Sequence, residues 1–270
     1  MPNEKTPLGC IGRKKNELKY LLPIIKENIN EETIFIEPFC GSCIISYNVF
    51  KLNVVKGFHI NDRDEIRMKF YNDMTDENER EKLYKIEDDI IEKGEEEYFK
   101  YVDKNKLKTD YISYVIGRRI HKFRYGLFPI ATKITSTKIS DNWLEFLTTA
   151  NKSTDDWKVI MEKYKDNKNA FIYLDPPYLD SCNASYCKYE KATMEDGTII
   201  DNTKIYIDIL NYLKNSKCKI LFSINKNYIT EHIYKDYIDK SYNKNYALTI
   251  LKSDEKPIKK NTNILIITNF

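Results

Sequence analysis

The segment FIYLDPPYLDS, residues 171–181, joins a strand-forming run to a carboxylate, two prolines and a tyrosine. Proline has no backbone N–H and cannot continue a sheet ladder, so the strand is expected to end at Asp175. Asp175 supplies a hydrogen-bond acceptor, and Tyr178 supplies a flat ring for stacking. Pro176 and Pro177 fix the direction of a backbone carbonyl. Two acceptors and a ring suit a planar exocyclic amine, whereas a Pro-Pro turn that merely ends a buried strand is the structural alternative.

Two earlier segments carry polar or turn-forming residues where predicted strands end. EPFCGSC, residues 37–43, places Gly41 and Ser42 where a backbone must pass close to a ligand and lead into a helix. NDRD, residues 61–64, places Asp62 where a carboxylate could accept hydrogen bonds from two ribose hydroxyls. Neither segment fits G-x-G-x-x-G or a P-loop, which disfavours dinucleotide and nucleoside-triphosphate sites. Each one alone is equally compatible with an ordinary strand-to-helix turn or a helix cap.

The elements that must position these segments alternate between helices and strands. Residues 15–28 place apolar side chains at helical spacing. A strand and turn at 33–42, a helix at 43–52, a strand at 57–62 and a helix at 65–74 are expected next. This order predicts a parallel sheet with right-handed crossovers. The pattern resumes with WLEFLTTA, 143–150, as a third strand, then a helix at 153–164, a strand running into DPPY, a helix at 203–216 and strands at 219–225 and 263–270.

The segment between these two blocks has a different character. Residues 75–100 carry eleven acids against five bases, which is typical of a solvated helical face. Residues 104–138 reverse the sign, with nine Lys and Arg residues against Asp110 and with aromatic residues interleaved in GRRIHKFRYGLF. Such a segment is typical of a surface that follows phosphates and touches bases. A basic surface helix with a loop is the structural alternative.

Composition excludes several other classes of protein. No apolar run approaches the roughly 20 residues that cross a bilayer, and MPNEKTPLGC contains no apolar signal core, so neither a membrane span nor secretion is expected. The net charge of +3 is too small to name a partner. Six cysteines do not form a disulfide framework, which favours a reducing interior. No metal site is expected, because the pair Cys182 and Cys187 that follows the C-x-x-C of Cys40 and Cys43 has poor spacing for zinc.

Taken in order, these segments resemble the Dam-type, D12 class of S-adenosylmethionine-dependent DNA adenine-N6 methyltransferases. GCIGRKKNELKYLLPII, residues 9–25, is similar to the family's G-x-K segment and the helix after it, and F-C-G, an acid after the second strand and DPPY follow in the family's order. The resemblance implies an α/β, Rossmann-like class I methyltransferase core with a mostly parallel sheet. It also implies a small, mainly helical inserted DNA-recognition domain at 75–140, between core segments 1–74 and 141–270.

The resemblance assigns roles to individual residues. Contacts to the cofactor S-adenosyl-L-methionine are implied at Cys10, Gly12, Lys14, Phe39, Cys40, Gly41, Asp62 and Asp175. Cys10 stands where the family usually has an aromatic residue, so a stacking surface is missing there. Catalytic roles are implied for Asp175, Pro176, Pro177 and Tyr178. DNA contacts are predicted at Arg118, Arg119, Lys122, Arg124 and Tyr125, with Phe128 as a further wedge.

The implied reaction is transfer of a methyl group from S-adenosylmethionine to the N6 amine of adenine in a specific double-stranded DNA sequence. The base is expected to flip out of the duplex and to react by direct in-line displacement without a metal. Asp175 and the Pro176 carbonyl are expected to hold one amine hydrogen each, with Tyr178 and Phe39 as stacking partners. Cytosine N4, an RNA amine, a protein glutamine and a non-catalytic nucleic-acid-binding subunit remain alternatives.

The resemblance also gives expectations about partners and location. Double-stranded DNA is the expected partner, with no membrane contact. A cognate restriction endonuclease of a restriction-modification pair stays open, as does the choice between a monomer and a weak dimer. An intracellular, soluble protein of the cytoplasm or nucleoid is expected, and a viral or phage origin stays open.

Overall fold

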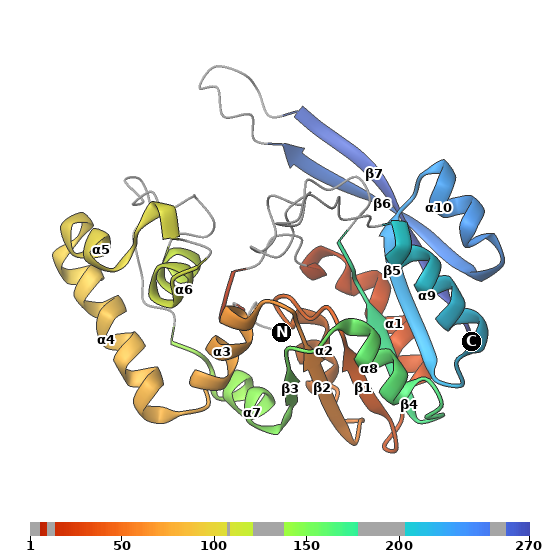
Figure 1. Cartoon of the computed structure of the whole chain (residues 1–270), viewed down its shortest axis with the longest axis horizontal. Coiled ribbons are helices and arrows are strands. Elements are labelled where there is room, and N and C mark those ends of the chain that lie inside the picture. Colours follow the sequence, from red (N-terminus) through yellow and green to blue (C-terminus); the bar gives the residue numbers. More distant parts are fainter. Residues whose placement is uncertain (1–5, 10–13, 107–108, 121–137, 178–202, 249–257) are drawn as a thin grey trace, which may run out of the picture.

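The structure, a computed structural model, describes residues 6–9, 14–106, 109–120, 138–177, 203–248 and 258–270. In these residues seven strands form one sheet in the order β3-β2-β1-β4-β5-β7-β6 (Figure 1). The strands are β1 (Ile34–Glu37), β2 (Gly57–Asn61), β3 (Asn151–Ser153), β4 (Ala170–Leu174), β5 (Lys219–Asn225), β6 (Ile238–Leu248) and β7 (Ile258–Thr268). The first five are parallel, and β7 runs antiparallel between β5 and β6.

Helices cover both faces of this sheet. They are α1 (Leu18–Asn28), α2 (Ile44–Phe50), α3 (Glu65–Asp73), α4 (Glu77–Lys93), α5 (Glu95–Tyr101), α6 (Tyr111–Arg119), α7 (Asp141–Thr149), α8 (Trp157–Tyr164), α9 (Thr203–Asn215) and α10 (Tyr228–Ile233). Short 3₁₀ turns are η1 (Lys14–Asn16), η2 (Lys104–Lys106) and η4 (Lys235–Tyr237). One buried cluster joins α1, α2 and α7 to the sheet, and a second joins α8, α9 and α10 to its other face. The predicted Rossmann-like α/β core is thereby confirmed.

The two clusters follow from alternation along the central strands. Phe35 and Phe171 are paired in the ladder between β1 and β4, and their rings stack 5.5 Å apart in the first cluster. The next pair, Ile36 and Ile172, points into the second cluster. All five residues of β4 are buried, which explains why AFIYL is apolar without a polar face. Burial on both faces fixes the register that sets the carboxyl ends of β1 and β4 side by side.

A topological switch point lies between β1 and β4. From β1 the chain runs through α2 to β2 on one side, whereas β4 lies on the other side of β1 and continues through α9 to β5. In open sheets of this kind ligands bind outside the carboxyl ends of the strands at such a point. The segments after β1, β2 and β4 are therefore the first place to look for a site.

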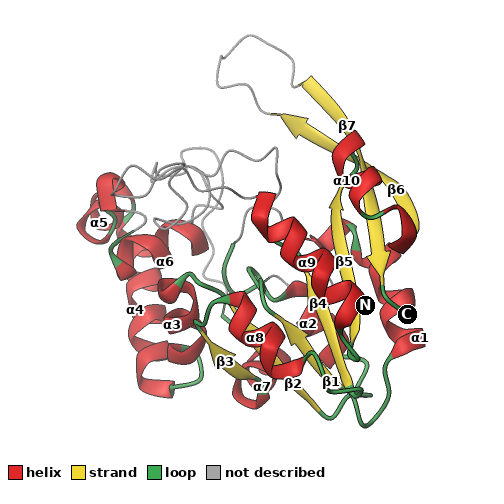
Figure 2. Ribbon diagram, turned by 45° about the vertical axis from the view of Figure 1, so that its right-hand side comes forward, coloured by secondary structure: helices red, strands yellow, loops and turns green. Residues whose placement is uncertain are grey.

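Three helices, α4, α5 and α6, stand together to one side of the sheet in both views (Figures 1 and 2). They follow α3 and precede α7, so they fall inside the range predicted as an insertion; its boundaries at 75 and 140 stay a prediction. Most acidic side chains on α4 and α5 are exposed, as a solvated face requires, but Glu87 and Glu97 are buried. Within the described residues no helix combines the length and apolar character needed to span a bilayer.

The sequence prediction was wrong for WLEFLTTA. Residues 141–149 form α7, and the third strand is the short β3 that follows it. Trp143, Phe146 and Leu147 are buried together, and their spacing of three and four residues is helical. A strand of the same residues would turn Phe146 and Leu147 to opposite faces of the sheet. The sequence prediction also omitted β6, so that β7 was expected without its hairpin partner.

Candidate active site

Polar side chains gather at the carboxyl ends of β1, β2 and β4. Asp175 follows β4 directly, and Asp62 follows β2. In the ladder, Ile36 of β1 pairs with Ile172 of β4, and Glu37 pairs with Ile60 of β2. The three strand ends are therefore level, and the two acids face the same edge of the sheet.

Asp175 is paired with Lys14 of η1. The Lys14 Nζ lies 2.6 Å from Asp175 Oδ1, and the two side chains are 5% and 18% exposed. Burial raises the pKa of Asp175, and the Lys14 charge opposes that rise. Burial alone would lower the pKa of Lys14, but the charge of Asp175, with Tyr173 and Glu17, raises it above its ordinary value. Lys14 is therefore a cation at neutral pH, and its charge favours the ionised form of Asp175.

A side chain of helix α9 contacts the backbone of the two prolines after Asp175. The Tyr206 hydroxyl, on α9, donates to the Pro177 carbonyl at 2.6 Å. Pro176 is buried, and Pro177 is half-buried. The fixed φ angles of proline and this hydrogen bond together restrict the backbone just after Asp175. Tyr178, the last residue of the motif, lies outside the described residues.

The turn after β1 brings the backbone of Gly41 against Asp62. Gly41 has a φ of 49°, a left-handed conformation that glycine adopts without strain, and its N–H donates to Asp62 Oδ2 at 2.9 Å. The Tyr71 hydroxyl donates to the Gly41 carbonyl at 2.8 Å. Cys43 has a φ of 54° and precedes α2. The close turn predicted at Gly41 is therefore hydrogen-bonded to Asp62, which the sequence predicted separately as a ligand-binding carboxylate.

Asp62 accepts three hydrogen bonds from its surroundings. Its Oδ2 accepts from Gly41 N–H and from the Arg67 Nη1 at 2.6 Å, and its Oδ1 accepts from the Asp64 N–H at 3.0 Å. A carboxylate offers about four acceptor positions, so these contacts among the described residues leave about one for a ligand. The Asp62 side chain is 15% exposed, which leaves it accessible from the strand edge.

Glu37, at the end of β1, is a buried acid to which the sequence analysis gave no role. Its Oε2 accepts from the backbone N–H of Ser46 at 3.1 Å and from the Ser46 hydroxyl, in the first turn of α2. Burial raises the pKa of Glu37 to about 8, so the side chain is largely neutral at pH 7. Glu37 therefore ties the start of α2 to β1 and fixes both ends of the Gly41 turn. A charged residue at the end of an apolar strand was the signal that could have identified it.

A second set of charges lies beside Lys14. The buried Glu17 accepts hydrogen bonds from the Tyr242 hydroxyl and the Lys244 ammonium group of β6. The rings of Tyr20 and Tyr242 stack 4.2 Å apart. These contacts dock the β6 strand, far along the chain, against the segment that carries Lys14. No pattern in the sequence indicated this pairing, because β6 was not predicted.

The remaining predicted cofactor residues are placed as follows. Phe39 is half-buried, and its ring lies 5.7 Å from that of Trp157 on α8. Cys40 and Cys43 are buried and free, with the Cys40 Sγ 3.9 Å from the Met68 sulfur. In the described residues no group of three or more His, Cys, Asp or Glu side chains could hold a metal ion. The last two predicted residues, Cys10 and Gly12, lie outside the described residues.

The predicted DNA-binding residues lie in different environments. Arg119 is buried, with its side chain 3% exposed; it forms a two-point ion pair with Glu87 of α4 and donates to the Pro7 carbonyl at 2.7 Å. In this structure the Arg119 guanidinium is therefore engaged inside the protein, and its predicted contact with DNA stays a prediction. Arg118 is half-buried and stacks on the Tyr114 ring at 3.7 Å. Outside the described residues lie Lys122, Arg124, Tyr125 and Phe128.

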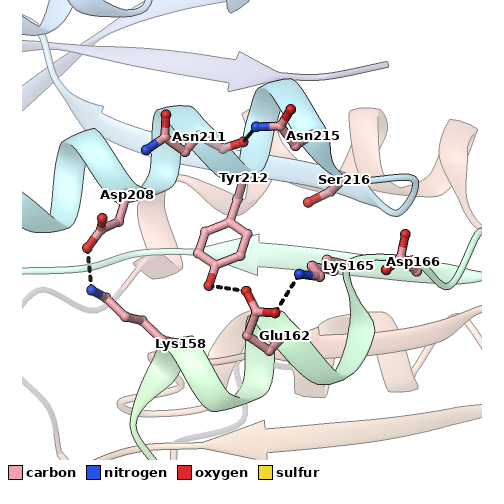
Figure 3. Close-up of a pocket in the computed structure, with 9 residues that line it drawn as sticks. All are labelled: Lys158, Glu162, Lys165, Asp166, Asp208, Asn211, Tyr212, Asn215 and Ser216. Atoms are coloured by element: carbon pink, nitrogen blue, oxygen red, sulfur yellow. Dashed lines mark hydrogen bonds and ion pairs between the residues drawn. The ribbon is translucent and has the colours of Figure 1, made fainter.

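A polar groove between α8 and α9 contains none of the predicted site residues (Figure 3). Four of its five charged side chains are matched in pairs: Lys158 with Asp208, and Lys165 with Glu162, which also accepts from the Tyr212 hydroxyl at 2.8 Å. The fifth, Asp166, is paired with Lys217. Mixed, mutually neutralised charges on two helices away from the strand ends do not indicate a ligand of one sign. The edge beside Asp62 and Asp175 is the better candidate.

One family model matches part of the chain in sequence. The model of the D12 class N6 adenine-specific DNA methyltransferase family matches residues 11–136, which include Lys14, the Gly41 turn, Asp62 and helices α1 to α6. No curated protein matches the chain in sequence.

Among solved structures, SMU.1697c, a candidate methyltransferase from Streptococcus mutans crystallised in complex with SAH, is similar to 95% of this chain and 98% of its own. The identity is 11% and the TM-score 0.32, too low to argue for a shared fold, so the fold assignment depends on the strand order. The family match confirms the resemblance that the sequence predicted: residues 11–136 are similar to the D12 class of N6 adenine-specific DNA methyltransferases.

Proposed function

We propose that the chain transfers a methyl group from S-adenosyl-L-methionine to the N6 amine of adenine within a specific sequence of double-stranded DNA. The observation that carries the proposal is the position of Asp175: half-buried, paired with Lys14 and followed by a rigid Pro-Pro turn, at the switch point and level with Asp62. This arrangement sets an acceptor for a planar amine beside a site for a nucleoside.

The residues at the strand edge fit S-adenosylmethionine. Asp62 retains about one acceptor position for a ribose hydroxyl, and its orientation is fixed by the Gly41 N–H and by Arg67. Gly41, with no side chain, lets the backbone approach a ligand closely. Lys14 is a cation that suits the carboxylate of an amino acid. When bound, S-adenosylmethionine would supply a sulfonium-activated methyl group.

The chain's own part in the chemistry is to hold the adenine amine. The ion pair with Lys14 engages Asp175 Oδ1, and the carboxylate has a second oxygen that can accept one amine hydrogen. The Pro176 carbonyl is the proposed acceptor for the other hydrogen. Two fixed acceptors orient the nitrogen and stabilise the positive charge that develops on it, which is catalysis by positioning and electrostatics. An adenine reaches such a buried acceptor only after it has left the base stack.

The DNA surface is proposed on the basic part of the segment between α3 and α7. Arg118 at the end of α6 and Lys138, which precedes α7, are described members of its positive charge. Neutralisation of several phosphates releases counterions, so we expect the association constant for DNA to fall steeply between about 50 and about 200 mM salt. Filter binding or fluorescence anisotropy would measure it, and an affinity that does not change with salt would exclude this surface.

The activity is tested by incubation of the purified chain with DNA and methyl-labelled S-adenosylmethionine. Mass spectrometry of the digested nucleosides should find N6-methyladenine, and modified-base sequencing should find it in one sequence context. N4-methylcytosine, a labelled protein or no product would overturn the proposal. The variant Asp175→Ala should lose the activity and keep its DNA affinity, whereas Asp208→Ala, which breaks a Lys–Asp pair in the groove between α8 and α9, should keep both.

A further inference from the structure

A continuous chain of hydrogen bonds and ion pairs joins α6 to the carboxylate of Asp62. It runs from the Tyr114 hydroxyl on α6 to Asp64, from Asp64 to Arg67, and from Arg67 to Asp62. Its two ends belong to different parts of the molecule, because α6 lies in the helical segment to one side of the sheet (Figures 1 and 2), whereas Asp62 directly follows β2.

Arg67 is the link nearest to the site. Its Nη1 lies 2.6 Å from Asp62 Oδ2 and its Nη2 lies 3.3 Å from Asp64 Oδ2, while its side chain is 13% exposed. The planar guanidinium holds two donors at a fixed angle, so the two carboxylates cannot move independently while both contacts persist. Lysine, with a single ammonium group, would keep the charge without this geometry.

Asp64 and Tyr114 carry the link to α6. Asp64 caps α3 by accepting the Arg67 N–H at 3.1 Å, and it also accepts from the Tyr114 hydroxyl. Tyr114 is 2% exposed, and the Arg118 guanidinium stacks on its ring. A shift of α6 therefore moves a hydroxyl that is bonded to the cap of α3, and α3 carries Arg67.

We propose that Tyr114 and Arg67 are positioning residues that couple the DNA-recognition segment to the cofactor site. The inference rests on the proposed function, because it takes Asp62 as the ribose acceptor and the segment around α6 as the DNA surface. DNA that holds α6 in place also holds Asp62 in its binding orientation, so DNA tightens the binding of the cofactor. Linkage requires that the cofactor tightens DNA binding by the same factor.

The chain offers a matched control on the same helix. The Tyr111 hydroxyl is hydrogen-bonded to Asp73, at the opposite end of α3 from Asp64. Tyr111→Phe and Tyr114→Phe each remove one hydroxyl that ties α6 to α3, and only the second acts on the contacts of Asp62. Any general loosening of α6 affects both variants alike, so a difference between them reports the Asp64–Arg67 link.

The test is a calorimetric titration of SAH, which binds without turnover, in the absence and presence of a saturating DNA duplex that the wild type methylates. We expect DNA to lower the dissociation constant of SAH by at least about fivefold in the wild type and in Tyr111→Phe, and by about twofold or less in Tyr114→Phe and Arg67→Lys. Thermal unfolding of each variant checks that it is folded.

The outcomes separate the inference from the proposed function. If the wild type methylates adenine and binds SAH, but DNA has no effect on SAH affinity, the coupling is refuted and the proposed function stands. The same conclusion follows if Tyr114→Phe keeps the wild-type factor, or if Tyr111→Phe loses it equally. If the folded wild type neither binds SAH nor methylates DNA, both proposals fail.

Discussion

Replacing Lys14 by methionine tests the electrostatics of the site most directly. Methionine keeps much of the volume of the side chain and removes its charge, which leaves the buried Asp175 carboxylate without the cation 2.6 Å away. Loss of one partner of a buried ion pair costs about 3 to 5 kcal/mol in the free energy of unfolding. Because Asp175 is 18% exposed, we expect the lower end of that range, about 3 kcal/mol at neutral pH.

The sign of the pH dependence follows from the state of Asp175. The cost of Lys14→Met arises from an ionised Asp175, so it shrinks as the pH falls and that carboxyl group takes up a proton. Without the Lys14 charge the pKa of Asp175 rises further. An acceptor role requires the ionised form, so the acid limb of the single-turnover methylation rate, measured at saturating S-adenosylmethionine, should move to higher pH.

Urea unfolding at pH 7.5 and pH 5 measures the stability part of this prediction. Lys158→Met is the matched control, because it removes the lysine of the pair with Asp208, is 41% exposed and lies away from the site. An exposed pair contributes about 1 kcal/mol or less, so the control should lose little stability at either pH. Equal losses in the two variants, or an unmoved acid limb in Lys14→Met, would refute the reasoning.

Three further predictions concern residues around the site. Burial raises the pKa of Glu37 to about 8 from an ordinary value of 4.5, so the unfolded chain loses this proton at a lower pH than the folded chain. Relative to Glu37→Gln, the free energy of unfolding of the wild type should therefore fall with rising pH by up to about 1.4 kcal/mol per pH unit. Urea unfolding that gives the same pH dependence for both proteins would contradict this. Arg119→Met should lower the free energy of unfolding by about 3 kcal/mol or more, because it leaves Glu87 without its partner. Adding Glu87→Gln to this variant should restore part of the lost stability. A loss of DNA affinity at unchanged stability would contradict a structural role for the buried ion pair. Tyr206→Phe should lower the single-turnover rate with a stability loss of about 1 kcal/mol, because the Pro177 carbonyl loses its donor; a wild-type rate would show that α9 does not support the turn.

The central strands and the edge they form were predictable from the sequence. Strands buried on both faces, such as β4 and β5, read as continuous apolar runs, and the alternation with helices identified a parallel sheet. Because parallel strands share a carboxyl edge, the acids that follow them could be expected to meet. The structure brings Asp62 to the Gly41 turn and Lys14 to Asp175, while the catalytic and cofactor roles of these residues stay predictions.

The contacts that were not predictable join residues far apart in the chain. Composition marked Arg119 as a surface base, yet Glu87, 32 positions earlier, holds it inside the protein. Tyr206 reaches Pro177 from a helix 29 positions later, and no local pattern connects the two. The error at α7 is of another kind, since Trp143 and Phe146 favour strands by propensity but are buried on one side of a helix. Tertiary packing overrode local preference there.

The adjacency of β1 and β4 has a consequence for the engineering of new target specificities. Phe35 and Phe171 are neighbours in the ladder although the whole helical segment separates them in the chain. A chimera that exchanges the predicted insertion, residues 75–140, for another segment would therefore keep both strands, and with them the proposed catalytic groups. It would also keep Asp64 without the hydrogen bond from Tyr114, so the proposed coupling requires a hydroxyl placed where Tyr114 now stands.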